Sequence, residues 1–136
     1  MENENQPDFS KFFLSEAEVF DLEDPNGNPL VFNGQPARVH LYGPATSVFS
    51  RAKAKQNDEA TKRVVAAMAS KGKKSDKADE DADAKFLCSI TEKFENFPFP
   101  GGAEAIYREP RLLYINNQVQ QIVGDLGNFF KGGKKT

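Results

Sequence analysis

The sequence predicts an α+β fold in which a small N-terminal antiparallel β-meander or hairpin packs with three to four α-helices, and the C-terminal half is mainly helical. β-rich runs separated by turn residues dominate the first third of the chain, whereas later apolar residues recur at helical spacing. The length of 136 residues suits a single domain, residues 1–136. Hydrophobic residues make up 38% of the chain, below the globular average, so part of it should lie outside the core.

Residues 18–42 carry the strand signals. Glu18–Leu22 and Pro29–Phe32 flank a turn at Asn26-Gly27, a dipeptide that readily adopts positive φ angles, and therefore predict a β-hairpin. In a third run, Ala37–Tyr42, apolar and polar side chains alternate, which predicts a half-buried strand and completes a three-stranded meander. Such a meander needs a cover for its apolar face. Residues 1–17 before it are rich in acids, and we expect them to form a flexible arm.

Residues 45–70 predict a helix that supplies this cover. Apolar stripes with three- and four-residue spacing run from Ala45 to Ala52 and from Thr61 to Met68, with a polar stretch between them. Two alternatives follow: one long helix with an exposed middle turn, or two helices broken near Asn57-Asp58.

Residues 71–83 form a low-complexity charged segment with no aromatic and no β-branched residue. Such a segment buries too little apolar area to offset the entropy of ordering it. Its acids could instead collect a metal ion, but they lack the glycine at position six and the final glutamate of a calcium loop. We therefore predict a flexible linker.

Residues 84–130 predict a helical part. A helix is expected from about Asp81 to Phe94, followed by an aromatic turn at Asn96–Gly102, a short helix at Ala103–Glu109 and a last helix beginning at Pro110. The last helix carries a heptad-like apolar seam: Leu112, Ile115, Val119, Ile122, Leu126 and Phe129. This seam either packs into the core or forms a surface for a protein partner or a second copy. Residues 131–136 are expected to be a disordered tail.

Charge is distributed in blocks around a net value of −2. Met1–Asp24 holds eight acids against Lys11, and Ala45–Lys74 holds eight bases against two acids. The two blocks either pair, within a chain or between copies, or form two solvated faces. Nucleic-acid binding is not expected, because Phe49 is the only aromatic residue in the basic helix and belongs to its apolar stripe.

The chain offers no catalytic constellation. His40 is the only histidine and is expected on the polar surface of a strand, while Cys88 is expected to be a small buried hydrophobe. We expect no enzyme activity, no cofactor and no metal site. No apolar run approaches the roughly 20 residues that span a bilayer, and the acidic N-terminus lacks the basic region of a signal peptide.

The C-terminal half resembles a known family. The residues that carry the resemblance are Phe97-Pro98, Tyr107 to Pro110, Leu113 to Ile115, Gln118-Val119 and Val123 to Phe129. In this pattern, and in the segment Ser47–Ala52, the chain is similar to the tail assembly chaperones of long-tailed, siphovirus-like bacteriophages and prophages. Unlike many members, it has no Trp-Gly-like turn before Phe97.

The resemblance implies a protein that acts in tail morphogenesis within the host bacterial cytoplasm and leaves before the virion matures. It would bind the phage tape measure protein, with tail tube subunits as a second implied partner and a homo-oligomer as a further arrangement. The residues expected to bind the partner are Phe97, Phe99, Tyr107, Leu126, Phe129 and Phe130. The alternative is a small nucleic-acid-associated or regulatory phage protein that uses the basic helix.

The sequence around Gly133-Lys134-Lys135 adds one expectation. Glycine codons followed by tandem lysine codons can encode a slippery run at which ribosomes shift back one nucleotide, as the resemblance implies for this family. The product would be a longer second form made by programmed frameshift. The alternative is a soluble tail of ordinary composition.

Overall fold

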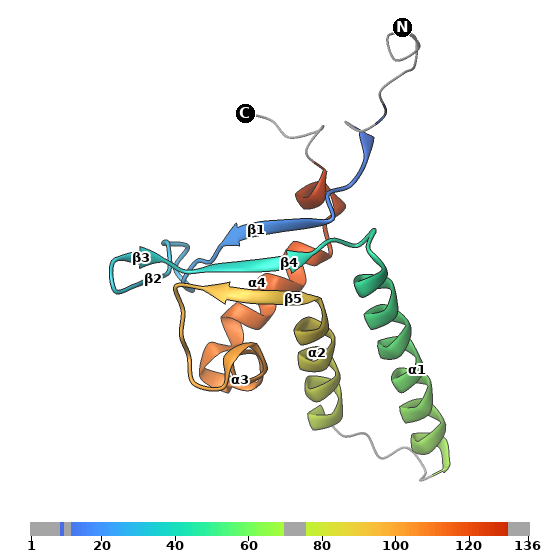
Figure 1. Ribbon diagram of the computed structural model, residues 1–136. Coiled ribbons are helices and arrows are strands. Elements are labelled where there is room, and N and C mark those ends of the chain that lie inside the picture. The colour runs from blue at the N-terminus through green and yellow to red at the C-terminus, as the bar shows by residue number, and fades with distance from the viewer. Residues whose placement is uncertain (1–8, 10–11, 70–75, 131–136) are drawn as a thin grey trace, which may run out of the picture.

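The computed structural model describes residues 9, 12–69 and 76–130, with side chains from residue 82 onward in the last range (Figure 1). It confirms the α+β class. The elements, with η marking a 3-10 helix, are β1 (Ala17–Asp21), β2 (Val31–Phe32), β3 (Gln35–Pro36), β4 (Arg38–Tyr42), α1 (Ser47–Ala69), α2 (Asp76–Ile90), β5 (Thr91–Glu95), α3 (Gly102–Arg108), η3 (Pro110–Leu112), α4 (Leu113–Val123) and η4 (Leu126–Phe129).

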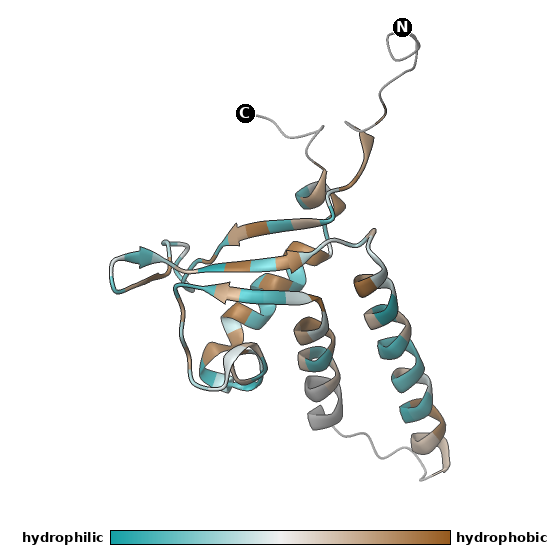
Figure 2. Ribbon diagram, viewed as in Figure 1, coloured by the Kyte–Doolittle hydropathy of each residue, from teal (hydrophilic) through white to brown (hydrophobic). Residues whose placement is uncertain are grey.

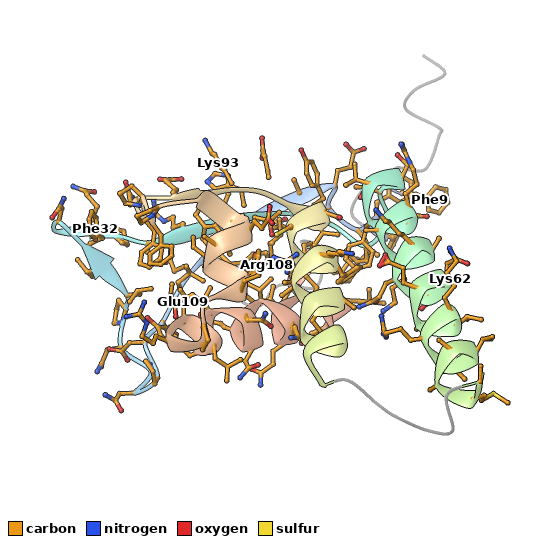
Figure 3. All side chains as sticks on the ribbon, turned by 90° about the horizontal axis from the view of Figure 1, so that it is seen from below. Phe9, Phe32, Lys62, Lys93, Arg108 and Glu109 are labelled. Carbon is orange, nitrogen blue, oxygen red and sulfur yellow. The ribbon has the colours of Figure 1, made fainter. Side chains whose placement is uncertain are left out.

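An antiparallel sheet of three strands in the order β1-β4-β5 forms the centre of the molecule. β4 is the middle strand, and its alternation is as predicted: Val39 and Leu41 are fully buried, whereas Arg38, His40 and Tyr42 are half-buried on the other face. The helices cover the buried side of the sheet. Lys93 projects outward from the opposite side, which no helix covers (Figure 3). One face of the sheet is therefore open.

The expected hairpin between Glu18–Leu22 and Pro29–Phe32 is wrong. β1 pairs with β4, and the two runs meet only near their inner ends, through an antiparallel bridge between Glu23 and Pro29 and a hydrogen bond of 2.9 Å from the Leu30 N–H to the Leu22 carbonyl. Asp24 explains the wider loop, because its Oδ1 accepts hydrogen bonds from the backbone N–H groups of Asn26 and Asn28 at 2.9 and 3.0 Å. β2 instead pairs with β3 in a separate small hairpin.

β5 is a strand that the sequence pattern did not predict. The helix expected to reach Phe94 ends at Ile90, and residues 91–95 pair with β4. Thr91 sits at the change, and its hydroxyl donates to the carbonyl of Leu87 at 2.6 Å. β4 is a central strand, so its backbone groups need partners on both edges, and β5 supplies the second edge. Phe94 still contacts the core because it lies opposite Val39. The expected helical part 84–130 therefore contains a strand.

The charged linker predicted for residues 71–83 is wrong from residue 76 onward, where α2 begins. Ala82 and Ala84 are buried, so this helix finds enough contact to be ordered despite its composition. Residues 71–75 lie outside the described part.

α1 is one continuous helix, so the alternative of a break near Asn57-Asp58 is wrong. The heptad seam, by contrast, is not continuous. α4 ends at Val123, and Leu126 and Phe129 belong to η4. Ile115, Val119 and Ile122 therefore share one stripe on α4, and Leu112 precedes them in η3. Gly124 and the 3-10 turn redirect the chain there.

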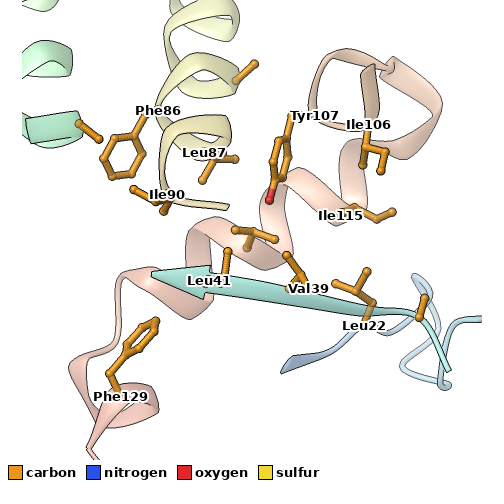
Figure 4. Packing of buried hydrophobic residues seen from close by; sticks show 14 residues of the cluster. Leu22, Val39, Leu41, Phe86, Leu87, Ile90, Ile106, Tyr107, Ile115 and Phe129 are labelled. Carbon is orange, nitrogen blue, oxygen red and sulfur yellow. The ribbon is translucent and has the colours of Figure 1, made fainter. Parts of the chain in front are cut away.

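The core gathers residues from all the main elements (Figure 4). Leu22, Leu41, Leu87, Ile115 and Phe129 are fully buried within one cluster. The two chain ends meet at one edge of it, because the N–H of Ser15 donates to the carbonyl of Phe129 at 2.6 Å and Leu14 packs on the cluster. The flexible arm expected for residues 1–17 is thus fixed from Leu14. Residues 1–8, 10–11 and 131–136 lie outside the described part.

Candidate partner-binding surfaces

Large apolar side chains remain exposed in several places. Among the described residues they are Phe9, Phe12, Phe13, Val19, Val31, Phe32, Val64, Val65, Met68, Leu113 and Leu126. Single exposed apolar residues are ordinary, but groups of them mark surfaces that bind other proteins. Three groups occur, at three separate parts of the fold.

The first group, here called the hairpin–turn surface, consists of the exposed Val31 and Phe32 together with Phe97 and Phe99, which are half-buried and pack in part against the core. Phe32 meets Phe97 edge to face at 6.5 Å between ring centroids, and Phe97 stacks with Phe99 at 6.4 Å. The amide of Asn96 donates to the carbonyl of Pro36 at 2.9 Å and so joins the turn to the hairpin. Two segments distant in sequence therefore present one aromatic surface.

The second group, the distal α1 surface, consists of Val64, Val65 and Met68, which are 59%, 60% and 75% exposed. They lie on the last turns of α1, where the ribbon turns apolar (Figure 2). α1 leans on α2 nearer its start, through buried Ala52 and an ion pair of 3.8 Å between Glu59 and Lys85. The end of α1 thus projects with apolar side chains in solvent.

The third group, the terminal surface, consists of Phe9, Phe12, Phe13 and Leu126. The rings of Phe9 and Phe12 lie 6.1 Å apart. Phe130 beside η4 is half-buried. The Ser15–Phe129 hydrogen bond brings the N-terminal phenylalanines and η4 to the same end of the molecule.

A groove runs between α1, α2 and α4. It encloses about 190 Å³ and is lined by Phe49, Lys53, Gln56, Asp83, Phe86, Leu87, Gln120, Val123 and Gly124. Phe49 and Phe86 meet edge to face at 5.4 Å, and the ammonium of Lys53 lies 5.2 Å from the centre of the Phe86 ring. Its lining therefore combines aromatic and polar side chains.

The open face of the sheet carries a charge cluster rather than an apolar patch. Arg38 Nε contacts Asp21 Oδ1 at 2.7 Å and Arg38 Nη1 contacts Glu95 Oε2 at 3.4 Å. His40 Nε2 lies 2.7 Å from Glu95 Oε1, so the expected surface histidine is half-buried and hydrogen-bonded. The hydrogen bond from His40, together with the charge of Arg38, holds the pKa of Glu95 below its usual range.

The contacts of this cluster and the burial of Cys88 describe two local environments. Three strands hold the cluster side chains to one another, which suits a structural role. Cys88 is half-buried, and burial raises the pKa of its thiol, so its thiolate is disfavoured. Among the residues that the structure describes, no group of three His, Cys, Asp or Glu side chains is placed to hold a metal ion.

The residues predicted to bind a partner divide into two sets. Phe97 and Phe99 lie together in the hairpin–turn surface, Leu126 is exposed and Phe130 is half-buried. Tyr107 and Phe129 are buried, so their assignment to a partner surface is corrected. The Tyr107 hydroxyl lies 2.7 Å from Thr91 Oγ1, and burial raises its pKa. Phe129 packs edge to face on Phe20 at 5.5 Å, inside the core.

The exposed groups also contain residues that sequence reasoning missed. The sequence pattern predicted that Val31 and Phe32 belong to a strand with a buried face. It also predicted that Val64, Val65 and Met68 belong to an apolar stripe that packs on the core. The three phenylalanines within Phe9–Phe13 could have been noticed, because so many rings in an acidic arm have no core to enter. Exposure of the other residues depends on which segments pack nearby.

Comparison with protein-family models, with curated proteins and with solved structures gives no significant match. None of the described helices combines the length and apolar character needed to cross a membrane.

Proposed function

We propose that this protein is a tail assembly chaperone of a long-tailed bacteriophage or prophage and that it binds the tape measure protein during tail morphogenesis. It would act in the bacterial host and leave before the virion matures. Tail tube subunits are a second candidate partner. The proposal describes a binding protein without catalytic chemistry.

The observation that supports the proposal is the distal α1 surface. Val64, Val65 and Met68 stand in solvent at the end of a projecting helix of 23 residues, so an apolar segment of a partner could pack along it. The hairpin–turn surface supplies a second apolar area, and it includes Phe97 and Phe99 from the segment that carries the family resemblance.

The sizes of these surfaces suit transient binding. Burial of one large apolar side chain stabilises a complex by about 1.5–3 kcal/mol, and a few such anchors dominate most interfaces. A chaperone that must later release its client needs few anchors. Small separate surfaces therefore fit this role better than one wide apolar face.

A nucleic-acid-associated role is the alternative. α1 carries five bases against two acids, but Lys62 pairs with Asp58 at 3.2 Å and Lys53 lies over Phe86. The aromatic ring of Phe49 packs against Phe86, which leaves α1 no exposed ring on which a base could stack. Phosphate contacts alone would give salt-sensitive binding without preference for sequence.

Co-expression with a candidate tape measure protein, identified among the neighbouring genes, tests the proposal. The chaperone should raise the soluble fraction of that protein and co-purify with it. A Val64→Ser/Met68→Ser variant should lose at least about tenfold in affinity, because two apolar anchors are removed. The control is Leu113→Ser, which alters an apolar residue about as exposed as Val64 and outside the three surfaces.

The proposal fails if the wild-type protein leaves the solubility of the tape measure protein unchanged at every ratio. Binding of duplex DNA in place of that protein would favour the alternative. A loss of thermal stability in Val64→Ser/Met68→Ser would instead show that these residues support the fold.

The programmed frameshift at Gly133-Lys134-Lys135 belongs to the same proposal. A minority of the product would continue in the −1 frame and extend the contact with the partner. Mass spectrometry of the natural products decides it, since detection of the 136-residue form alone would exclude the longer one.

A further inference from the structure

We propose that the outer edge of β1 binds an extended basic peptide segment, which adds to the three-stranded sheet as a further antiparallel strand. The binding site, here called the β1 edge, consists of the outward backbone groups of Ala17, Val19 and Asp21 and the hollow beside them. It differs from the apolar surfaces that support the proposed function, so the inference does not rest on that function.

The pairing of β1 with β4 turns the backbone groups of every second residue outward. In an antiparallel ladder, residues that exchange hydrogen bonds with the neighbouring strand alternate with residues whose N–H and C=O groups point away from it. The Leu22 N–H donates to the Ala37 carbonyl at 2.9 Å, which places the even-numbered residues of this segment in the first set. The odd-numbered residues, from Ala17 to Asp21, therefore point to the outer edge.

This outward row has partners at both ends but none in the middle. At one end the Ser15 N–H donates to the Phe129 carbonyl at 2.6 Å. At the other end the Gln118 side chain takes the place of a strand, since its Oε1 accepts from the Glu23 N–H at 2.9 Å and its Nε2 donates to the Glu23 carbonyl at 3.0 Å. Between them, no described residue hydrogen-bonds the outward groups. Three donors and three acceptors thus remain open.

A hollow of about 320 Å³ lies beside this edge, next to α4 and η4. Its lining residues are Phe20, Asp21, Glu23, Gln118, Gln121, Ile122 and Asn128. The charged residues among them are the two acids. Successive side chains of a strand alternate between the two faces of a sheet. Every second side chain of an added strand would therefore enter the hollow, and the others would lie beside the exposed Val19 on the open face.

Charge selects a basic segment as the occupant, because Ser15–Asp24 contains five acids and no base. Asp21 is paired with Arg38 at 2.7 Å. Glu16 and Glu23, by contrast, are exposed and form no ion pair with a described residue. A lysine or arginine in the hollow would meet Glu23 and the oxygens of neighbouring side-chain amides. A second copy of β1 would instead bring the same acids to the edge, where like charges repel.

The segment that fits best alternates apolar and basic residues. Directly opposite residues of two strands share a face, so the apolar residues would lie opposite Ala17 and Val19 and form the backbone hydrogen bonds. The basic residues would then point into the hollow. In recognition by strand addition, the backbone bonds give affinity and the alternate side chains give selectivity.

The synthetic peptide acetyl-Val-Lys-Val-Lys-Val-Lys-Val-amide, titrated calorimetrically into the full chain, tests the proposal. It should bind, whereas the same peptide with glutamate in place of lysine should not. Two further versions carry N-methyl groups on either the valine or the lysine amides, and their charges are unchanged. Methylation of the valines should weaken binding by about tenfold or more, because it blocks the paired edge of the peptide. Methylation of the lysines should leave binding intact.

Amide hydrogen exchange, followed by NMR at each residue, locates the peptide. In the free protein the Val19 N–H should exchange faster than the Phe20 N–H, which the pairing with β4 protects. The peptide should slow exchange at Val19 by about tenfold or more and leave Phe20 unchanged.

Two variants test the backbone and the charge separately. Val19→Pro removes an outward N–H group that the fold does not use, and proline is tolerated in this position of an edge strand. It should weaken binding by about fivefold or more. Glu23→Gln should weaken binding by about threefold, and Glu92→Gln on the far edge strand is its matched control. Circular dichroism checks that each variant is folded.

Three results would overturn the proposal: no binding of the lysine peptide up to about 1 mM, equal binding of the two methylated peptides, or exchange protection confined to residues outside the β1 edge. Equal losses in Glu23→Gln and Glu92→Gln would mean that general charge attraction, rather than this site, holds the peptide. Dimerisation of the free protein with protection of the Val19 N–H would assign the edge to a second copy and contradict a basic occupant.

Discussion

Charged side chains on the open face of the sheet contact one another across the strands. Arg38, His40 and Glu95 lie on neighbouring strands, and each of their contacts crosses from one strand to the next. Cross-strand pairs of opposite charge stabilise sheets modestly when they are exposed, so this cluster holds register more than it adds stability. Glu95 takes part in two of these contacts, which makes it the residue to test.

Glu95→Gln should lower stability near neutral pH and have little effect in acid. The hydrogen bond from His40 and the charge of Arg38 lower the pKa of Glu95 in the folded state, below its ordinary value of 4.5. The stabilisation is therefore present above that value and is lost as the pH falls through the folded-state pKa. Urea unfolding of both proteins across this range measures the difference.

Glu92→Gln is the matched control, since Glu92 lies on the same strand and is exposed. It should leave the pH dependence unchanged. An equal effect of the two substitutions would mean that net charge, rather than the cluster, governs stability in acid.

At the scale of elements, α2 and β5 depend most on their surroundings. α2 begins among charged residues that no packing pattern marks as helical, and β5 continues from it without a loop. Both are explained by neighbours: α1 and the core receive Ala82, Ala84 and Leu87, and β4 offers an unpaired edge to Thr91–Glu95. Packing therefore stabilises these elements more than their intrinsic preference does.

Replacement of residues 76–83 by a Gly/Ser sequence of equal length should lower thermal stability. Gly in a helix costs about 1 kcal/mol per residue relative to Ala, and the contacts of Ala82 would also be lost. Circular dichroism would record a lower melting temperature and less helix. Replacement of 71–75 alone serves as the comparison, and an equal melting temperature for 76–83 would restore the linker interpretation.

At the scale of the molecule, one cluster joins the two ends of the chain. Phe129 near the C-terminus packs on Phe20 in the first strand, and its carbonyl accepts a hydrogen bond from Ser15. The apolar surfaces lie around this core, on the hairpin and turn, on the end of α1 and at the termini. A small core is thus combined with separate exposed apolar surfaces.

Phe129→Ala should destabilise the whole molecule by about 3–5 kcal/mol, because it leaves a cavity at the point where the chain ends meet. That is a large share of the roughly 5–15 kcal/mol that stabilises typical domains. Leu126→Ala, which truncates an exposed side chain on the same turn, should change stability by less than about 0.5 kcal/mol. Urea denaturation followed by circular dichroism measures both, and equal losses would place Leu126 in the core as well.

The sequence by itself determined the α+β class, the buried alternation of Val39 and Leu41 and the helical character of residues 45–70, because these features depend on local periodicity. That α1 is one unbroken helix was decided by the structure. Local patterns also indicated the aromatic turn at Asn96–Gly102, in which Phe97 and Phe99 stack. Tertiary structure alone decided that β1 pairs with β4, that residues 91–95 form a strand, and that Phe129 is core while Val64 and Met68 are exposed. The reason is physical: a pattern shows which side chains can be buried together, but burial depends on which distant segment covers them.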